Sequence, residues 1–175
     1  MSAVSSLPAK PAIAPPAEEA TARQAERFLF QEAWLLDHSD FDAWLDLYTD
    51  DAVYWVPLEA GQADPLNTHS LMYDDKRLMQ IRVRQQTHPR AHARLPLSRT
   101  VHQVGNVQVQ DTGKVGELTV RSTLILFEYR KERQRSFAAN VVHRLRLQGD
   151  VWKICHKRVD LINSESELDG IAFFF

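Results

Sequence analysis

The sequence contains little cysteine and little glycine, and each scarcity excludes a class of protein. Cys155 is the single cysteine of 175 residues, so neither a disulfide framework nor a cysteine-rich metal cluster can form within the chain. The six glycines lack the spacing of a phosphate-binding loop. Folding must therefore rest on a hydrophobic core.

Charge of one sign and long apolar runs are also missing. The formal net charge is −2, from 21 basic and 23 acidic residues, which gives no basic face for nucleic acid. No segment approaches the roughly 18 consecutive apolar residues of a membrane span. The first 20 residues lack the apolar core of a signal peptide. We therefore expect a cytoplasmic protein that binds neither nucleic acid nor membrane.

What the chain does contain is enough apolar material for one core. Hydrophobic residues make up 44% of the sequence, and a domain of this length buries about 70% of its unfolded surface. Residues 1–20 are rich in alanine, proline and serine, which predicts a flexible arm. Residues 21–175 are predicted to form a single domain.

Helical periodicity dominates the first part of this domain. Residues 18–39 carry an apolar stripe at spacings of three and four, which predicts a helix with these buried positions: Ala22, Ala25, Leu29, Ala33 and Leu36. A second helix is predicted within residues 39–51, with Ser39 and Asp42 as a capping box. Its buried face comprises Phe41, Trp44, Leu45 and Tyr48.

The middle of the chain alternates between strand, loop and helix signals. Residues 52–57 read as a strand that ends at Pro57, and residues 58–70 as a loop. A third helix is predicted within residues 73–86, opened by Asp74 and Asp75.

From Thr100 onward the hydrophobic period changes to two, which is typical of β-strands. Four strands are predicted, joined by hairpin turns: residues 101–110, 116–130, 135–147 and 151–162. Helices followed by a meander of long strands predict an α+β fold with the helices on one face of the sheet. Such a sheet curls into a cone, and its interior is where an enzyme of this build would keep its chemistry.

No metal site is predicted within the chain. His88 and His92 have the spacing of one helix face, but Pro89 and Pro96 argue against a continuous helix there. No Cys-x-His pair occurs, so the chain cannot hold a Rieske cluster. Cys155 lies in an alternating segment and is predicted to be a buried, inert thiol, and no serine has the G-x-S-x-G environment of a nucleophile.

Acid–base chemistry inside the cone remains an alternative. Its candidates are Tyr48, Asp51, His102, His143 and Asp160, because an apolar pocket can shift carboxylate or imidazole pKa values towards neutrality. His143 alternates with apolar residues, but a histidine on such a face is more often a hydrogen-bonded core residue. The three phenylalanines at 173–175 should be buried, either within this fold or against a neighbouring subunit, and we favour a subunit boundary.

Four segments together resemble one known family. In chain order they are "FLFQEAWLLDHSDFDAWLDLYTDDAVYWVP", "LMYDDKRLMQIRVRQ", "PLSRTVHQVGNV" and "VWKICHKRVDLINSE", followed by the phenylalanine-rich end. This order resembles the small (β) subunit of aromatic ring-hydroxylating dioxygenases over residues 24–175. The combination "YDD…RV.R" and "SRT.H…NV" carries most of the specificity. The chain departs from the pattern at Val101, where the family often has arginine, and in its short loop at 60–70.

The resemblance implies a cystatin-like cone with helices packed on a strongly curved, mixed, six-stranded sheet. It also implies a non-catalytic subunit that trimerises beneath three large (α) subunits, in an α3β3 hexamer that cis-dihydroxylates an aromatic ring. The large subunits would carry the Rieske [2Fe–2S] cluster and the mononuclear Fe(II), with electrons from NAD(P)H through a reductase.

The family also implies contact or scaffold roles for Tyr73, Asp74, Arg82, Arg99 and His102, none of them catalytic. The alternative is a stand-alone dehydratase or isomerase of the same superfamily, using Asp51 or Asp160 with His102 or His143. Pocket content separates the two, because a cone filled by bulky side chains leaves no substrate site. The predicted fillers are Trp55, Phe127, Leu145 and Trp152.

Overall fold

The computed structural model describes residues 15–87, 96–166, 168 and 170–175. In chain order the elements are α1 (Glu19–Asp37), α2 (Phe41–Asp46), β1 (Tyr48–Pro57), β2 (Ser70–Asp75), α3 (Lys76–Thr87), β3 (Arg99–Asp111), β4 (Glu117–Arg130), β5 (Arg133–Gln148) and β6 (Val151–Leu161). His88, His92 and most of the predicted arm, residues 1–14, lie outside the described residues.

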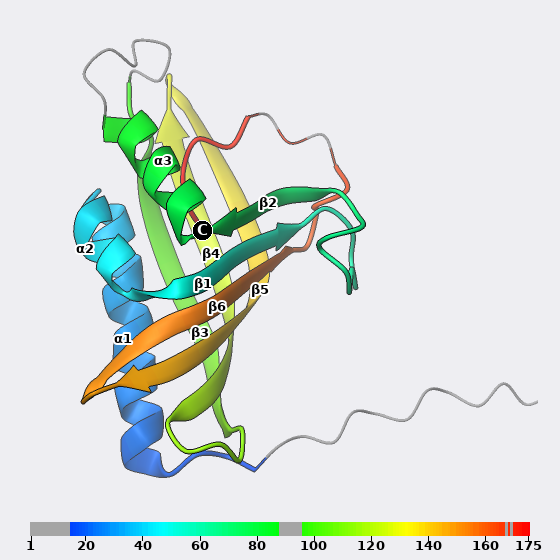
Figure 1. Ribbon diagram of the computed structural model, residues 1–175. Coiled ribbons are helices and arrows are strands. Elements are labelled where there is room, and N and C mark those ends of the chain that lie inside the picture. Colours follow the sequence, from blue (N-terminus) through cyan, green and yellow to red (C-terminus); the bar gives the residue numbers. More distant parts are fainter. Residues whose placement is uncertain (1–14, 88–95, 167, 169) are drawn as a thin grey trace, which may run out of the picture.

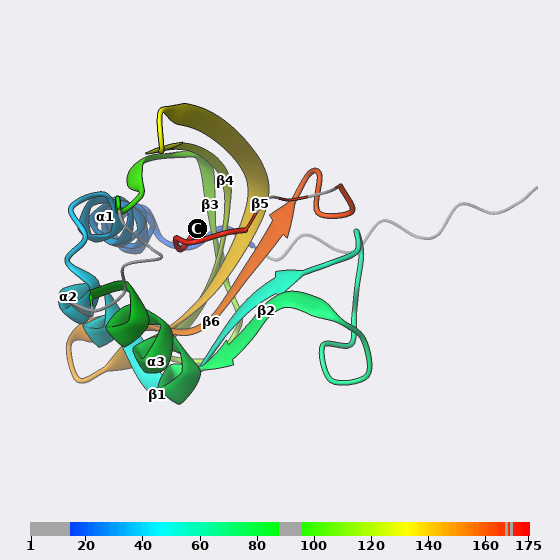
Figure 2. The same ribbon diagram turned by 90° about the horizontal axis from the view of Figure 1, so that it is seen from above.

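The strands form one six-stranded sheet in the order β2-β1-β6-β5-β4-β3. The pair β1 and β6 is parallel, and all other pairs are antiparallel. Figure 1 shows the three helices gathered on one side of this sheet. Seen from above in Figure 2, the sheet curves around an interior that the helices close. The predicted α+β fold, a helix-covered curved mixed sheet, is confirmed.

The first two helices form for the reasons that the sequence indicates, with a different boundary between helix and strand. Helix α1 buries four positions of the predicted stripe together with Glu32, and Leu29 is 1% exposed. Helix α2 is capped by Asp40, whose side chain accepts from the Ala43 amide, rather than by Ser39. The predicted second helix is too long, because Tyr48 already belongs to β1.

Strand β2 was not predicted from the residue pattern. Residues 70–75 pair with β1, so that Tyr73 lies opposite Trp55 and Asp74 opposite Tyr54. The helix predicted from residue 73 begins only at Lys76, where the Asp75 carboxylate accepts the Leu78 amide at 2.8 Å. A six-residue strand is too short for its alternation to outweigh the helical signal that follows it.

The phenylalanine-rich end fills the interior of the cone. Phe173, Phe174 and Phe175 are 5%, 2% and 1% exposed. In Figure 2 this segment lies between the helices and the curved sheet. The Phe174 ring lies 4.3 Å from the Trp44 ring, and Phe175 packs on Phe137 at 5.7 Å. The prediction of a subunit boundary here is wrong, because the fold of the same chain covers all three rings.

Two of the four predicted fillers of the cone lie elsewhere. Leu145 is fully buried in the core. Trp152 is partly buried and packs against the core. Trp55 and Phe127 lie on the outer face, where Trp55 contacts Tyr73 and Phe127 is 41% exposed. None of the helices in the described part of the chain is long and apolar enough to cross a membrane.

Candidate functional site

A buried polar cluster lies inside the cone and centres on Glu32 of α1. Its carboxylate accepts from Lys157 Nζ of β6 at 2.7 Å and pairs with His143 Nε2 of β5 at 2.9 Å. Tyr48 and Trp44 donate to the same carboxylate at 3.0 and 3.3 Å. The cluster thus joins the first helix to the two central strands.

Burial and mutual attraction together set the charges of this cluster. Burial by itself would raise the pKa of Glu32, but Lys157 and His143 outweigh it and hold that pKa well below its usual range. Burial lowers the pKa of His143, although Glu32 opposes this shift. Burial also lowers the pKa of Lys157 against the pull of Glu32. The favoured state is an ionised Glu32–Lys157 pair beside a neutral imidazole.

His102 ties α1 and the phenylalanine-rich end to β3. Its Nδ1 lies 2.6 Å from Asp37 Oδ1, and its Nε2 lies 3.1 Å from the Phe174 carbonyl oxygen. Asp37 also accepts the His102 backbone amide at 2.9 Å and the Thr100 hydroxyl at 3.0 Å. These hydrogen bonds hold the pKa of Asp37 below its ordinary value despite partial burial. All of these contacts lie within one chain.

Neither of the two cavities that the described residues enclose around the Glu32 cluster and His102 has room for a substrate. The cavity beside the Glu32 cluster measures about 20 Å³, and a second, at the mouth of the cone beside His102, measures about 20 Å³ as well. Pockets for small organic molecules are roughly 300–1,000 Å³. Either cavity holds about one water molecule.

The acids proposed for the enzyme alternative lie outside the cone. Asp51 is 64% exposed and pairs with Arg146, which holds its pKa below the ordinary value. Asp160 makes a two-pronged ion pair with Arg158 on the outer face. The predicted His–Asp pairings with these two acids are therefore wrong. The buried acid beside His143 is Glu32. His143 itself is a hydrogen-bonded residue of the core, which is the interpretation that the sequence favoured.

The five positions implied by the family resemblance do not form one cluster. Asp74, 2% exposed, pairs with Arg82 of α3 through two guanidinium nitrogens. Tyr73 lies on β2 and Arg99 on β3, which are the two edge strands of the sheet. Tyr73 is 36% exposed, and Arg99 stacks over the Tyr129 ring at 4.8 Å. Only Asp74 and Arg82 contact each other.

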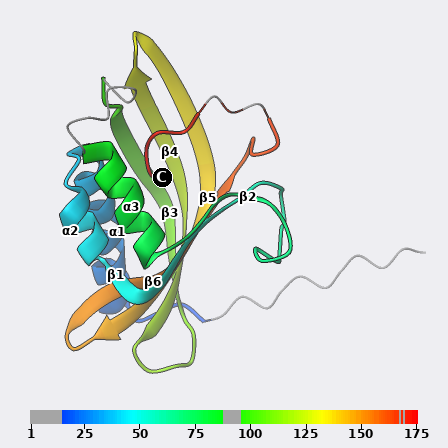
Figure 3. The ribbon, with the colours of Figure 1, turned by 45° about the horizontal axis from the view of Figure 1, so that its top comes forward.

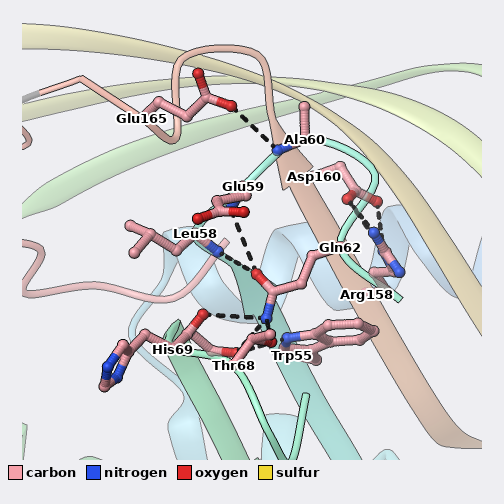
Figure 4. Close-up of polar contacts among 11 residues, drawn as sticks. Trp55, Leu58, Glu59, Ala60, Gln62, Thr68, His69, Arg158, Asp160 and Glu165 are labelled. Carbon is pink, nitrogen blue, oxygen red and sulfur yellow. Dashed lines mark hydrogen bonds and ion pairs between the residues drawn. The ribbon is translucent and has the colours of Figure 1, made fainter. Parts of the chain in front are cut away.

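The outer face carries its own polar cluster around the loop that follows β1 (Figure 4). The Gln62 side chain accepts the Leu58 amide at 3.0 Å and donates to the His69 carbonyl at 3.0 Å, which closes the loop on itself. Beside it, the Arg158 guanidinium lies 4.3 Å from the Trp55 ring and pairs with Asp160. An open groove of about 390 Å³ runs between this loop and β6. Of the charged groups that line it, Arg158 and Asp160 pair with each other.

No group of His, Cys, Asp and Glu in the described residues has the arrangement of a metal site. Cys155 is only partly buried, rather than fully buried as predicted, and burial raises the pKa of its thiol. A raised pKa disfavours the reactive thiolate.

Sequence reasoning missed three residues of the interior: Glu32, Asp37 and Lys157. A signal for two of them was present. Glu32 stands within the apolar stripe of α1, three residues after Leu29, and Lys157 alternates with Val159 and Leu161 in β6. A charged residue at a core position predicts a buried partner.

Comparison with known proteins gives a consistent family. Residues 31–166 match the model of the ring hydroxylating beta subunit family. The chain is 30% identical over 171 residues to the biphenyl 2,3-dioxygenase subunit beta of Rhodococcus jostii, covering 91% of each chain. It is 30% identical over 163 residues to the benzene 1,2-dioxygenase subunit beta of Pseudomonas putida, covering 87% of each.

A solved structure agrees with these relatives. The crystal structure of the beta subunit of the benzoate 1,2-dioxygenase from Burkholderia mallei superimposes with a TM-score of 0.71 at 31% identity, covering 87% of this chain and 96% of that one. The dehydratase alternative finds no such support. The family match covers most of the domain, and the cone is filled by its own side chains. The chain belongs to the family of ring-hydroxylating dioxygenase beta subunits, and such a subunit implies an alpha subunit as its partner.

Proposed function

We propose that this chain is a non-catalytic scaffold of a ring-hydroxylating dioxygenase. Three copies form the trimeric base of an α3β3 hexamer, in the cytoplasm, beneath three large subunits. The observation that carries the proposal is the filled interior, because Phe174 and Phe175 occupy the space that a substrate would need.

The chemistry belongs to the large subunit in this proposal. That subunit carries the Rieske [2Fe–2S] cluster and the mononuclear Fe(II), receives electrons from NAD(P)H through a reductase, and adds both oxygen atoms of O2 to an aromatic ring. The relatives described above are named for biphenyl, benzene and benzoate. Neutral and acidic aromatic compounds both occur in this set, so we propose an aromatic substrate without a narrower class.

Two of the family positions are suited to contact with another subunit. Tyr73 and Arg99 expose their side chains on opposite edge strands, and an arginine fork can bind a carboxylate of a partner through two hydrogen bonds. Asp74, Arg82 and His102 have scaffold roles instead. The first two fix α3 to β2, and His102 fixes α1 to β3.

Purification of the full chain together with its partners tests this function. The tagged chain, purified from the cells that naturally produce it, should be recovered in a 1:1 ratio with a larger subunit. The complex should contain the iron of both centres and show the visible absorption of a Rieske cluster. Recovery of a single iron-free chain with its own turnover of an aromatic or hydroxylated substrate would overturn it.

A charge reversal tests the proposed contact residues. Arg99→Glu should weaken recovery of the larger subunit, whereas the matched control Arg121→Glu, also exposed on the sheet, should leave it unchanged. Equal recovery with both variants would exclude Arg99 as a contact.

A further inference from the structure

The one buried side-chain nitrogen without a partner among the described residues is Nδ1 of His143. Its ring is 3% exposed, and its other nitrogen is bound to Glu32 at 2.9 Å. Glu32 is ionised and can only accept a hydrogen bond, so Nε2 carries the proton and donates. The neutral ring then presents an unshared electron pair at Nδ1. An acceptor buried without a donor is costly, and native proteins rarely leave one.

A cavity lies at the same place. His143, Ser122 and Lys157 all line the space of about 20 Å³ beside the Glu32 cluster, and Leu29, Val104 and Leu124 complete its wall. A space of this size admits one water molecule and nothing larger. The lining is mostly apolar, and His143, Ser122 and Lys157 are among the few polar residues that reach it.

Each of these polar groups has hydrogen-bonding capacity left. Ser122 is 6% exposed, and its hydroxyl makes no hydrogen bond to any described residue. The Lys157 ammonium has three N–H groups, of which two are used by Glu32 at 2.7 Å and the Phe175 oxygen at 2.6 Å. A buried water requires two to four polar partners, as a rule about three.

The strand register explains why a water fits better than a direct contact. His143 lies opposite Val120, and Ser122 lies opposite Val141, so His143 and Ser122 are diagonal neighbours on the same face of the sheet. Diagonal pairs are separated by about 7–8 Å, and in this structure no direct hydrogen bond joins His143 Nδ1 to the Ser122 hydroxyl. One water between them spans that distance.

We propose that this cavity is a specific site for a single structural water, which donates to His143 Nδ1, exchanges a hydrogen bond with the Ser122 hydroxyl and accepts the third N–H of Lys157. The water completes a network that runs from α1 through the neighbouring strands β4, β5 and β6. It also holds the His143 ring in the tautomer that serves Glu32. This inference is independent of the subunit's partners.

A crystal structure of the full chain at a resolution that places waters is the direct test. One density peak should occupy the cavity, about 2.7–3.2 Å from both His143 Nδ1 and Ser122 Oγ. An empty cavity would overturn the proposal, and so would a Ser122 hydroxyl bonded directly to Nδ1 or a ring turned so that Nδ1 faces Glu32.

A matched pair of variants tests the site in solution. Ser122→Ala removes one partner of the water, and Ser136→Ala removes an exposed serine from the outer face of the sheet. Ser122→Ala should lower the thermal midpoint by about 2–4 °C relative to Ser136→Ala. Equal midpoints would contradict a hydrogen-bonding role for Ser122. Whether a water occupies the cavity is decided by the electron density of the wild-type protein, without either variant.

Discussion

Removal of the Glu32 carboxylate is the sharpest perturbation of this fold. Glu32→Gln keeps the size of the side chain and its contacts with Tyr48 and Trp44, but it deletes the charge that faces Lys157 at 2.7 Å. Lys157 is 3% exposed, so its ammonium cannot turn to solvent. The variant therefore leaves the buried Lys157 ammonium without the Glu32 charge, with the Phe175 oxygen at 2.6 Å as its other hydrogen-bond partner.

The expected cost follows from the burial of both partners. Breaking a buried ion pair by removing one member destabilises a protein by about 3–5 kcal/mol, because the remaining charge is left uncompensated. For a domain of 150–250 residues, this corresponds to a fall in thermal midpoint of about 6–20 °C. An exposed pair, such as Arg23 with Glu19, would contribute at most about 1 kcal/mol.

Urea unfolding at fixed protein concentration measures the free energy of unfolding. The wild type, Glu32→Gln, Lys157→Met and the double variant form a cycle. Since the double variant contains no unpaired charge, it should recover most of the loss of Glu32→Gln. Glu19→Gln on the exposed face of the same helix is the matched control and should change stability by less than about 0.5 kcal/mol.

Two results would refute this reasoning. If Glu32→Gln costs less than about 1 kcal/mol, Lys157 reaches solvent or loses its proton without penalty. If the double variant loses the sum of the two single losses, the two residues are not coupled, and the ion pair does not hold α1 to the sheet.

Three further perturbations have defined outcomes. Phe174→Ala should lower the free energy of unfolding in urea by about 3–5 kcal/mol, because the ring is 2% exposed and packs against Trp44. Phe30 is 46% exposed, so Phe30→Ala should cost far less, and equal losses would contradict a C-terminal segment that fills the cone. His102→Ala removes the ring's hydrogen bonds to Asp37 and to the Phe174 carbonyl oxygen and should cost about 1–3 kcal/mol. An unchanged thermal midpoint would exclude this link between α1, β3 and the phenylalanine-rich end. Acid should destabilise the fold, since folding lowers the pKa values of Glu32 and His143 and the unfolded chain binds more protons. Stability should therefore fall as the pH drops below 6.5, the ordinary pKa of histidine, and further below 4.5, that of glutamate; a flat profile between pH 7 and 4 would contradict this.

Local periodicity carried most of the secondary structure. The α1 stripe and the four alternating segments after residue 99 predicted elements that the structure contains with shifts of at most a few residues. These elements are long, so their patterns repeat several times. Short elements were missed or misplaced, as β2 and the boundary at Tyr48 show. The fold class and the family were readable because the order of elements and the quoted motifs are properties of the chain alone.

The interior was decided by the tertiary structure. Glu32 meets His143 and Lys157 across 111 and 125 residues, and no local pattern specifies such a meeting. It depends on a register that places β5 and β6 beside each other, with α1 packed across the concave face. Figure 3 shows the helices and the phenylalanine-rich end on that same side.

By itself, then, the sequence determined the elements, the fold class and the family. Only the tertiary structure decided which face each strand turns inward, that the phenylalanines at 173–175 fill their own cone, and that the buried acid is Glu32 rather than Asp51 or Asp160. The physical reason is that periodicity is a property of neighbours in sequence. Burial and charge pairing depend on which distant segments the curved sheet brings together.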